Sequence, residues 1–415
     1  MRLAAAWVVP VEGPPVRNGW VAVRDGRIAA VGAGDDPEAR AWGPRRDLGS
    51  VVLVPGLVNA HVHFELSWLR GQVSPAGEFT AWVKQLLAAR GGVERPDDPR
   101  VVEAAAAAAS EARALGTVAV GDISNSLMSV APIEQAGLSG IVFHELLGFR
   151  ETDGALVART REARAEAGRQ CRRVRVAVAP HAPYSVSAEL FRAIRDEAGA
   201  TGAPAISVHV GESPAEMQLL NDGTGEWARM LRAMGAWRED WRPPATGPVE
   251  YLDELGLIGP TTLVVHGVQL ADESLTRLAA RGATLVTCPR SNQWVGVGAP
   301  PAERFYASGA TVAVGTDSLA SVADLNLFEE LRTLRRLAPG VPARRLIESA
   351  TLAGARALGL GDELGSLVPG KRADIVAVSL PPDVEDVEEH LVRGITQRDI
   401  AWAWTTTSLD SAISR

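Results

Sequence analysis

The sequence predicts an α/β protein, a (β/α)8 TIM-type barrel with a small β-sandwich domain that is built from both chain ends. Three observations lead to this fold class. The chain has 415 residues, which exceeds the roughly 250 residues of a bare barrel and leaves room for a minor domain. Its middle part alternates short apolar runs with helical patterns. Both of its ends carry strand-like alternation of apolar and polar residues instead.

The first part of the predicted β domain covers residues 1–54. Apolar and polar positions alternate there, and Asp25-Gly26 lies between two short runs, as in a β-hairpin. A similar stretch, GSLVPGKRADIVAVSL, returns at residues 365–380. We therefore expect residues 361–415 to supply the second part of this domain, together with a tail.

The predicted barrel covers residues 55–360, with its first strand beginning just before this range. Amphipathic stretches separate successive apolar runs, and their ends are recognisable: Asp272 can cap a helix that Gly282 ends. This alternation is typical of repeated βα units that close into a parallel barrel. The eight apolar runs are VVLVPGLVNAH, TVAVGD, GIVFHE, VRVAVAPH, AISVHVGE, TTLVVH, ATLVTC and TVAVGTD.

The connection between the fifth and sixth runs, about residues 213–260, is too long for a plain loop. We predict a partly helical insertion there. It contains Trp227, Trp237 and Trp241. These tryptophans either form a homodimer contact or cover the mouth of the barrel, and the sequence leaves both alternatives open.

Composition excludes several classes of partner. The net charge is −8, and no basic stretch interleaved with aromatic residues is present, so we expect no nucleic acid. Cys171 and Cys288 fit no metal-binding spacing, and so few cysteines are typical of a reducing compartment. No run approaches the roughly 18 apolar residues of a membrane span, and the start lacks a cleavage site. We expect a cytoplasmic protein without a membrane partner.

The chemistry-bearing residues gather where the predicted strands end, which is where barrel enzymes place their active sites. Six of the 7 histidines follow this rule, and His390 is the exception. His61 and His63 are two residues apart on one strand, so they point to the same side. Together with His209 and Asp317 from other strands they can bind one metal ion.

The metal centre should be mononuclear. A binuclear barrel site needs a carboxylated lysine from a middle strand, and the two lysines lie elsewhere: Lys84 in a helical stretch and Lys371 in the terminal β segment. Imidazole and carboxylate ligands suit Zn(II), which we favour, but they also suit Fe(II), and the sequence does not separate the two.

Three residues are predicted to be catalytic. A metal strongly lowers the pKa of bound water, to about 7. Glu212, three residues after His209, is placed to take a proton from that water and deliver it to a ring nitrogen. His266 can orient the attacking oxygen, and Asp317 can help a proton to reach departing ammonia.

The sequence resembles the amidohydrolase superfamily, in particular its branch of cytosine, guanine and S-adenosylhomocysteine deaminases and triazine chlorohydrolases. The similarity covers nearly the whole chain, including the closing GSLVPGKRADIVAV segment. It implies the same ligands and the same roles for Glu212 and His266, and it implies that His181 contacts substrate. The motifs that carry it are PGLVNAHVH, PHAPYS, HVGES, VVHGVQL, CPRSN and GTDSLAS, which begin at residues 55, 180, 209, 264, 288 and 315.

Within this branch, HVHFELS, PVEYLDELGLIGPTTLVVHG and CPRSN look most like aminodeoxyfutalosine deaminases of the futalosine route to menaquinone. The resemblance implies a 6-aminopurine nucleoside substrate with a carboxyphenyl arm. Arg290 can bind its carboxylate, although a structural role for this arginine is an equal alternative. Glu65, Trp68 and Asn292 are expected at the same rim. We interpret Asp122 and Glu145, which also end strands, as supporting or packing groups.

Other functions stay open at this stage. The same centre could deaminate another aminopurine, a pterin or a cytosine, or it could displace chloride from a triazine. A non-catalytic metal-binding barrel is a remote alternative, since none of the ligands and catalytic residues is missing. The sequence has no phosphate-binding GK[ST] loop, which argues against a nucleotide-phosphate enzyme.

Overall fold

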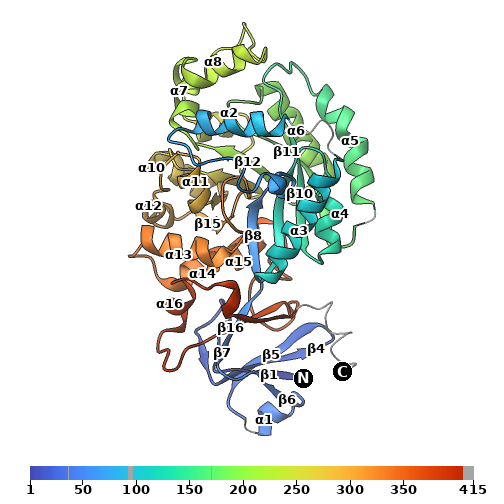
Figure 1. The fold of residues 1–415 in the computed structure, drawn as a ribbon, viewed down its shortest axis with the longest axis vertical. Helices are drawn as coiled ribbons and strands as arrows, with labels where there is room; N and C mark the ends of the chain where they lie inside the picture. The colour runs from blue at the N-terminus through green and yellow to red at the C-terminus, as the bar shows by residue number, and fades with distance from the viewer. Residues whose placement is uncertain (36, 92–96, 170, 405–415) are drawn as a thin grey trace.

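The computed structural model describes residues 1–35, 37–91, 97–169 and 171–404. A barrel forms the larger part of the molecule, and a β domain containing the N-terminus lies at one end (Figure 1). Helices α2, α7 and α8 lie at the opposite end of the molecule from the β domain. Within the described ranges, we find no helix with the length and hydrophobicity that a bilayer crossing requires.

The β domain consists of two sheets that pack as a sandwich. One sheet has the strand order β5-β4-β1-β6 and the other the order β17-β16-β7-β2-β3. The predicted hairpin at Asp25-Gly26 joins β4 to β5, and both turn residues have the positive φ angles that such a turn requires. The elements of the β domain are β1 (Arg2–Ala4), β2 (Trp7–Val8), β3 (Val16–Arg17), β4 (Gly19–Arg24), β5 (Arg27–Ala33), α1 (Pro37–Arg40), β6 (Arg45–Asp47), β7 (Val51–Pro55), β16 (Ile375–Ser379) and β17 (Ile400–Trp404).

Eight parallel strands form the barrel. They pair in sequence order within two groups, β8 to β11 and β12 to β15. At one seam the His209 amide donates to the His181 carbonyl, and at the other Val62 bridges Asp317. The strands are β8 (Leu57–Val62), β9 (Thr117–Ser124), β10 (Ser139–Leu146), β11 (Val174–Pro180), β12 (Ile206–Val210), β13 (Thr262–His266), β14 (Thr284–Thr287) and β15 (Thr311–Val314). The predicted α/β barrel is thereby confirmed.

Helices surround the barrel and contribute the predicted insertion, in which α7, α8 and α9 lie between β12 and β13. The helical elements after α1 are η1 (Phe64–Leu69), α2 (Phe79–Arg90), α3 (Pro99–Ala114), α4 (Val130–Gln135), α5 (Ala155–Gly168), α6 (Ala188–Thr201), α7 (Pro214–Asp222), α8 (Gly225–Ala233), α9 (Pro248–Glu254), α10 (Asp272–Arg281), α11 (Pro289–Trp294), α12 (Ala302–Ala307), α13 (Leu327–Leu337), α14 (Ala343–Ser349), α15 (Leu352–Ala357), α16 (Val387–Leu391) and η2 (Gln397–Asp399).

The helix for which the sequence predicts Asp272 as the N-cap begins one residue earlier than predicted. Ala271 occupies the cap position and Asp272 is the first helical residue. The Asp272 carboxylate lies 2.7 Å from the Arg304 guanidinium, so this side chain forms an ion pair instead of a cap. Gly282 does end the helix, in the left-handed conformation expected of glycine there.

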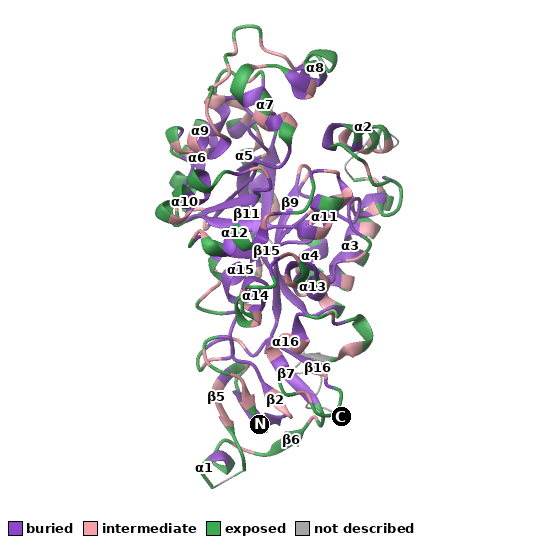
Figure 2. Cartoon of the chain, turned by 90° about the vertical axis from the view of Figure 1, so that its left-hand side faces the viewer, coloured by how far each residue is buried: buried purple, intermediate pink, exposed green. Residues whose placement is uncertain are grey.

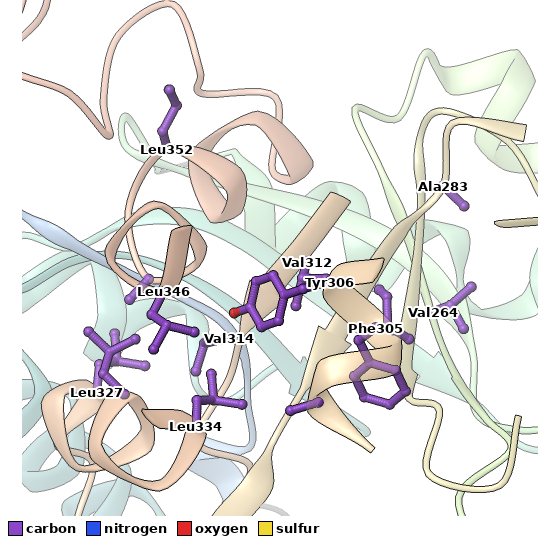
Figure 3. Packing of buried hydrophobic residues seen from close by; sticks show 14 of the residues in the cluster. Val264, Ala283, Phe305, Tyr306, Val312, Val314, Leu327, Leu334, Leu346 and Leu352 are labelled. Carbon is purple, nitrogen blue, oxygen red and sulfur yellow. The ribbon is translucent and has the colours of Figure 1, made fainter. Parts of the chain in front are cut away.

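The core lies between the barrel strands and the helices around them. Strands β8, β9 and β10 are buried at every position, which is typical of parallel strands covered on both faces. Figure 2 shows β9 in the colour of buried residues. Helices α12, α13 and α14 pack their apolar faces toward β15. Figure 3 shows this packing, with labelled side chains that include Tyr306, Val312, Val314, Leu334 and Leu346.

The division of the chain into residues 1–54, 55–360 and 361–415 stays our proposal. Strand β7 belongs to the β domain, and Gly56 alone separates it from β8 of the barrel. The last part of the predicted tail, residues 405–415, lies outside the described residues.

Candidate metal centre and active site

The four predicted metal ligands come together at the C-terminal ends of three barrel strands. His61 lies in β8 and His63 directly after it, and both face the same side because strand residues alternate. His209 is in β12, and Asp317 follows β15. Two sets of three residues each have their ligand atoms within 4.8 Å of one another, and His61 belongs to both sets. The first set is His61, His63 and Asp317, and the second is His61, His209 and His266.

The spacing of these atoms fits a metal ion. Nε2 of His61 and Nε2 of His63 are 3.1 Å apart, and Oδ1 of Asp317 lies 3.4 Å from Nε2 of His63 and 3.9 Å from Nε2 of His61. Ligand atoms at about 2.0–2.1 Å from a tetrahedral ion are about 3.3 Å from one another. The donor set of imidazoles and one carboxylate also matches the preference of a borderline divalent ion.

Electrostatics keep the imidazoles available as ligands. Burial lowers the pKa of His63 to about 3 and that of His209 to about 4. Burial also lowers the pKa of His61 well below its usual value. These rings are therefore neutral at pH 7, with a nitrogen lone pair free for a cation.

The backbone around Asp317 is unusual in two ways. Its φ angle is 60°, a left-handed conformation that costs energy for a residue with a side chain. Gly315 lies against β8 so closely that a Cβ there would be 2.6 Å from the carbonyl oxygen of His61. Ser291 holds the carboxylate, because its hydroxyl donates to Oδ2 of Asp317 at 2.6 Å. Oδ1 is left to face the histidines.

Glu212 lies beside this cluster, as predicted, and it is almost fully buried. Burial raises its pKa well above the usual value, and the neighbouring carboxylates of Asp317 and Glu216 raise it further. Glu216 fixes the loop, because its carboxylate accepts hydrogen bonds from the amides of Gly211 and Glu212 at 2.9 and 3.0 Å. The sequence carried a signal for Glu216 in Ser213-Pro-Ala-Glu216, the S-x-x-E pattern of a capping box.

His266 ends β13 with a φ angle of 77°, another left-handed residue at the site. Its Nε2 lies 3.6 Å from Oε1 of Glu212. On the other side of the ring, Nδ2 of Asn292 lies 2.9 Å from Nδ1 of His266. Burial lowers the pKa of His266 well below its usual value, so the ring is neutral. With Asn292 donating to Nδ1, the proton of this ring is on Nε2 and faces Glu212.

His181 follows β11 and lines the cavity beside the metal centre. Its Nδ1 lies 2.5 Å from the Ser185 hydroxyl, a residue of the same PHAPYS motif. Its carbonyl oxygen accepts from Nδ1 of His209 at 3.1 Å, which directs Nε2 of His209 toward the cluster. His181 therefore faces the space that a substrate would fill.

A cavity of about 410 Å³ opens from the metal centre toward the surface. Its inner end contains His63, His209, Glu212, His266 and Asp317. Its walls are mostly apolar and come from η1, α2, the loops after β10 and β11, and α8. They include Leu66, Phe79, Trp82, Val83, Phe149, Tyr184, Trp227 and Met230. Such a cavity has the size and polarity of a small-molecule site.

Four predicted substrate contacts need correction. Arg290 does not line the cavity, because its guanidinium pairs with Glu330 at 2.6 Å and Asp324 at 2.8 Å. Glu65 is buried behind the wall, where Ser124 and the Ser126 amide donate to its carboxylate. Trp68 packs on the apolar cluster around the cavity without lining it. Asn292 positions His266 instead of lining the cavity.

The structure adds residues that the sequence did not single out. Glu145, interpreted as a supporting group, lines the cavity, and Asn125 donates to its Oε2 at 2.9 Å. Tyr184 stacks on Trp227 with ring centroids 4.0 Å apart. Arg90, the last residue of α2, also lines the cavity. The strand-end position of Glu145 and the PHAPYS motif that contains Tyr184 were visible in the sequence, whereas Arg90 depends on how α2 folds over the barrel.

Comparison with known proteins agrees with this geometry. The model of the amidohydrolase family matches residues 52–401. Aminodeoxyfutalosine deaminase of Deinococcus radiodurans is 33% identical over 354 residues, covering 82% of this chain and 81% of the relative. 5-Methylthioadenosine/S-adenosylhomocysteine deaminase of Moorella thermoacetica is 30% identical over 410 residues, covering 95% and 90%.

A solved structure points the same way. An adenosine deaminase from Xanthomonas campestris with bound zinc is 29% identical and superposes with a TM-score of 0.81. The match covers 98% of this chain and 91% of the other. The strand-end ligands, the buried glutamate and these similarities lead to one conclusion: the chain belongs to the amidohydrolase family, and within it the protein is a metal-dependent hydrolytic enzyme of the deaminase type.

Proposed function

We propose that this protein hydrolytically deaminates a 6-aminopurine nucleoside, and that its substrate is aminodeoxyfutalosine, which would place it in the futalosine route to menaquinone. One observation carries the proposal. Glu212 is a buried carboxyl group with a raised pKa, 3.6 Å from Nε2 of His266 and at the inner end of the cavity. Deamination at C6 needs such a group, because a ring nitrogen must be protonated before the carbon accepts an oxygen.

The residues fit a single divalent ion, and we propose His61, His63, His209 and Asp317 as its ligands. Zinc is our choice because the Xanthomonas relative holds zinc, and Fe(II) is the alternative. When bound, the ion acts as a Lewis acid that makes a water molecule acidic at neutral pH. Neither lysine competes for this site, since Lys84 pairs with Glu226 and Lys371 with Glu12.

This chain's own side chains then move the protons. Glu212 takes a proton from the attacking water and delivers it to the ring nitrogen next to C6. A C6–O bond forms, and neutral His266, with its proton on Nε2, stabilises the negative charge on the oxygen that attacks C6. As the C6–N bond breaks, Asp317 accepts the remaining proton from the new C6 hydroxyl group and passes it to the amino group, so that C6 becomes a carbonyl and the amino group leaves as ammonia.

Relatives support a nucleoside substrate but not one identity. The two curated relatives carry the names of an aminodeoxyfutalosine deaminase and a 5-methylthioadenosine/S-adenosylhomocysteine deaminase, at 33% and 30% identity. All of these named substrates contain a 6-aminopurine with an extended group on the ribose. The apolar outer half of the cavity supports an aromatic arm, since it is lined by Phe79, Trp82 and Trp227.

Ammonia release by the metal-loaded protein tests the proposal. Aminodeoxyfutalosine, 5-methylthioadenosine, S-adenosylhomocysteine, adenosine and a chlorotriazine are compared, with Glu212→Gln as the control. We expect the highest kcat/KM on aminodeoxyfutalosine, and a loss of at least about 100-fold in the control at unchanged metal content. A preference for another nucleoside would refute the substrate but keep the chemistry.

The alternatives have less support. Triazine hydrolases share only 20% identity with this chain, so their similarity concerns the fold alone. Release of chloride from the triazine would favour a triazine hydrolase. No product from any of the compounds would favour a non-catalytic metal-binding barrel. A homodimer and a cytoplasmic location stay predictions, of which light scattering tests the first.

A further inference from the structure

The outer rim of the cavity is unusually apolar for a surface. Leu87 of α2, Leu147 after β10 and Met234 after α8 all line the cavity, and they are 42%, 48% and 59% exposed. Three separate segments thus present large apolar side chains around one opening. Such a concentration on a soluble protein marks a surface that a bound ligand covers.

Charge in this cavity is divided between its two ends. The lining carboxylates are Glu145, Glu212 and Asp317, which all lie at or just after the ends of barrel strands. Arg90, by contrast, lies at the end of α2, the helix that also carries the rim residue Leu87. The inner end is therefore acidic apart from its histidines, and the outer wall carries a cation.

This cation has no directly bonded anion in the described part of the chain. Its side chain forms no ion pair, hydrogen bond or aromatic contact there, and Glu145 feels its charge only at longer range. Arg290, the arginine expected from the sequence, pairs with Glu330 and Asp324. Lys84, on the same helix as Arg90, pairs with Glu226. An arginine in a largely apolar wall without an anion is suited to a ligand that brings one.

The charge of Arg90 reaches the interior of the cavity. Burial lowers the pKa of His181 to about 4, and the positive charge of Arg90 adds to this decrease. At Glu145, where burial raises the pKa, the same charge acts in the opposite direction. Arg90, which lines the cavity, is therefore close enough for its charge to act on groups nearer the metal centre.

We propose that Arg90 is a specificity residue that binds a carboxylate at the far end of an apolar arm of the substrate. The proposal rests on the deaminase function proposed above and narrows its substrate class. A neutral arm, such as a methylthio group, would leave the arginine unused. A zwitterionic amino-acid arm would need a carboxylate for its ammonium group, and Glu145, the lining carboxylate that feels the charge of Arg90, is already engaged by Asn125 and His209. An aromatic carboxylate satisfies both the apolar rim and the cation.

The test uses two adenosine derivatives with the same 5′-aryl arm, one ending in a carboxylate and the other in a carboxamide. Their affinities for the metal-loaded enzyme are measured by calorimetry, and their kcat and KM by ammonia release. We expect the wild type to prefer the carboxylate by about 10- to 100-fold, mainly through KM. Arg90→Gln should lose this preference, and Arg90→Lys should restore part of it.

Lys84→Gln is the matched control, because it removes a cation from the same helix at an exposed ion pair that does not line the cavity. It should keep the preference. Equal affinity of wild type for both ligands, or an unchanged preference in Arg90→Gln, would overturn the role of Arg90. If neither compound is deaminated but the carboxylate preference is present, the proposed substrate class fails and the role of Arg90 stands.

Discussion

Buried carboxyl groups around the site serve different purposes, and their partners decide which. Glu212 faces the ligand cluster, while Glu216 accepts two backbone amides and holds the loop. Asp122 is fully buried in β9, where it accepts from the Phe64 amide at 2.8 Å and from the Ser129 hydroxyl at 2.5 Å. It thereby fixes the chain directly after His63. Burial raises its pKa to about 8, so this carboxyl group is largely neutral at pH 7.

The raised pKa of Asp122 predicts a pH-dependent difference between the wild type and Asp122→Asn. The folded state keeps its proton up to about pH 8, whereas the unfolded chain releases it near 3.8. Stability from this group is thus present at low pH and is lost as the pH rises through that interval. Between pH 5 and 7 the unfolding free energy of the wild type should fall relative to the variant, by up to about 1.4 kcal/mol per pH unit. Denaturant titrations measure this, and parallel curves would contradict it.

At the scale of elements, α2 and α8 form the outer walls of the cavity. Tyr184 stacks on Trp227, and Phe79 of α2 contacts both rings. Trp227 is only 6% exposed, so this tryptophan of the insertion supports the alternative of a cover over the barrel mouth. Trp237 lies further out, where it stacks on Phe149 with centroids 5.8 Å apart.

Trp227→Ala should weaken substrate binding more than Trp237→Ala does. The first change removes a ring that lines the cavity, whereas the second removes a ring behind the lining residue Phe149. We expect KM to rise about 10-fold or more for Trp227→Ala, since aromatic stacking and the buried wall are both lost. Trp237→Ala should change KM by less than about threefold. Steady-state kinetics decide, and equal effects would argue against this division of roles.

At the scale of the whole molecule, the β domain supports the barrel strand that carries His61 and leads into His63, two of the proposed ligands. Strand β7 pairs with β16, and Gly56 alone separates it from β8. Val376 of β16 is fully buried and shares a core cluster with barrel residues. A Cβ at Gly116, just before β9, would lie 3.0 Å from Val376, so the two domains are closely packed there.

Val376→Asp should therefore damage the metal centre from a distance. A buried charge without a partner costs several kcal/mol, and it would separate β16 from the base of the barrel. We expect a lower denaturation midpoint and a reduced metal content after purification. Val102→Asp, at a position on α3 that is 36% exposed, is the control and should leave both near the wild-type values. Full metal content in Val376→Asp would contradict this coupling.

The sequence by itself determined the barrel, and it predicted that His61, His63, His209 and Asp317 lie together beside Glu212. The C-terminal ends of the strands in a parallel barrel lie at one face. Because His61, His63, His209 and Asp317 all lie at or just after such ends, their positions in the sequence were enough to predict that they lie close together. Only the tertiary structure decided which arginine faces the cavity. Arg290 is adjacent to a strand end, but Glu330 of α13 pairs with it, while Arg90 comes from a helix that folds over the mouth. A side chain's partners depend on how distant elements pack, and local sequence patterns carry no record of that packing.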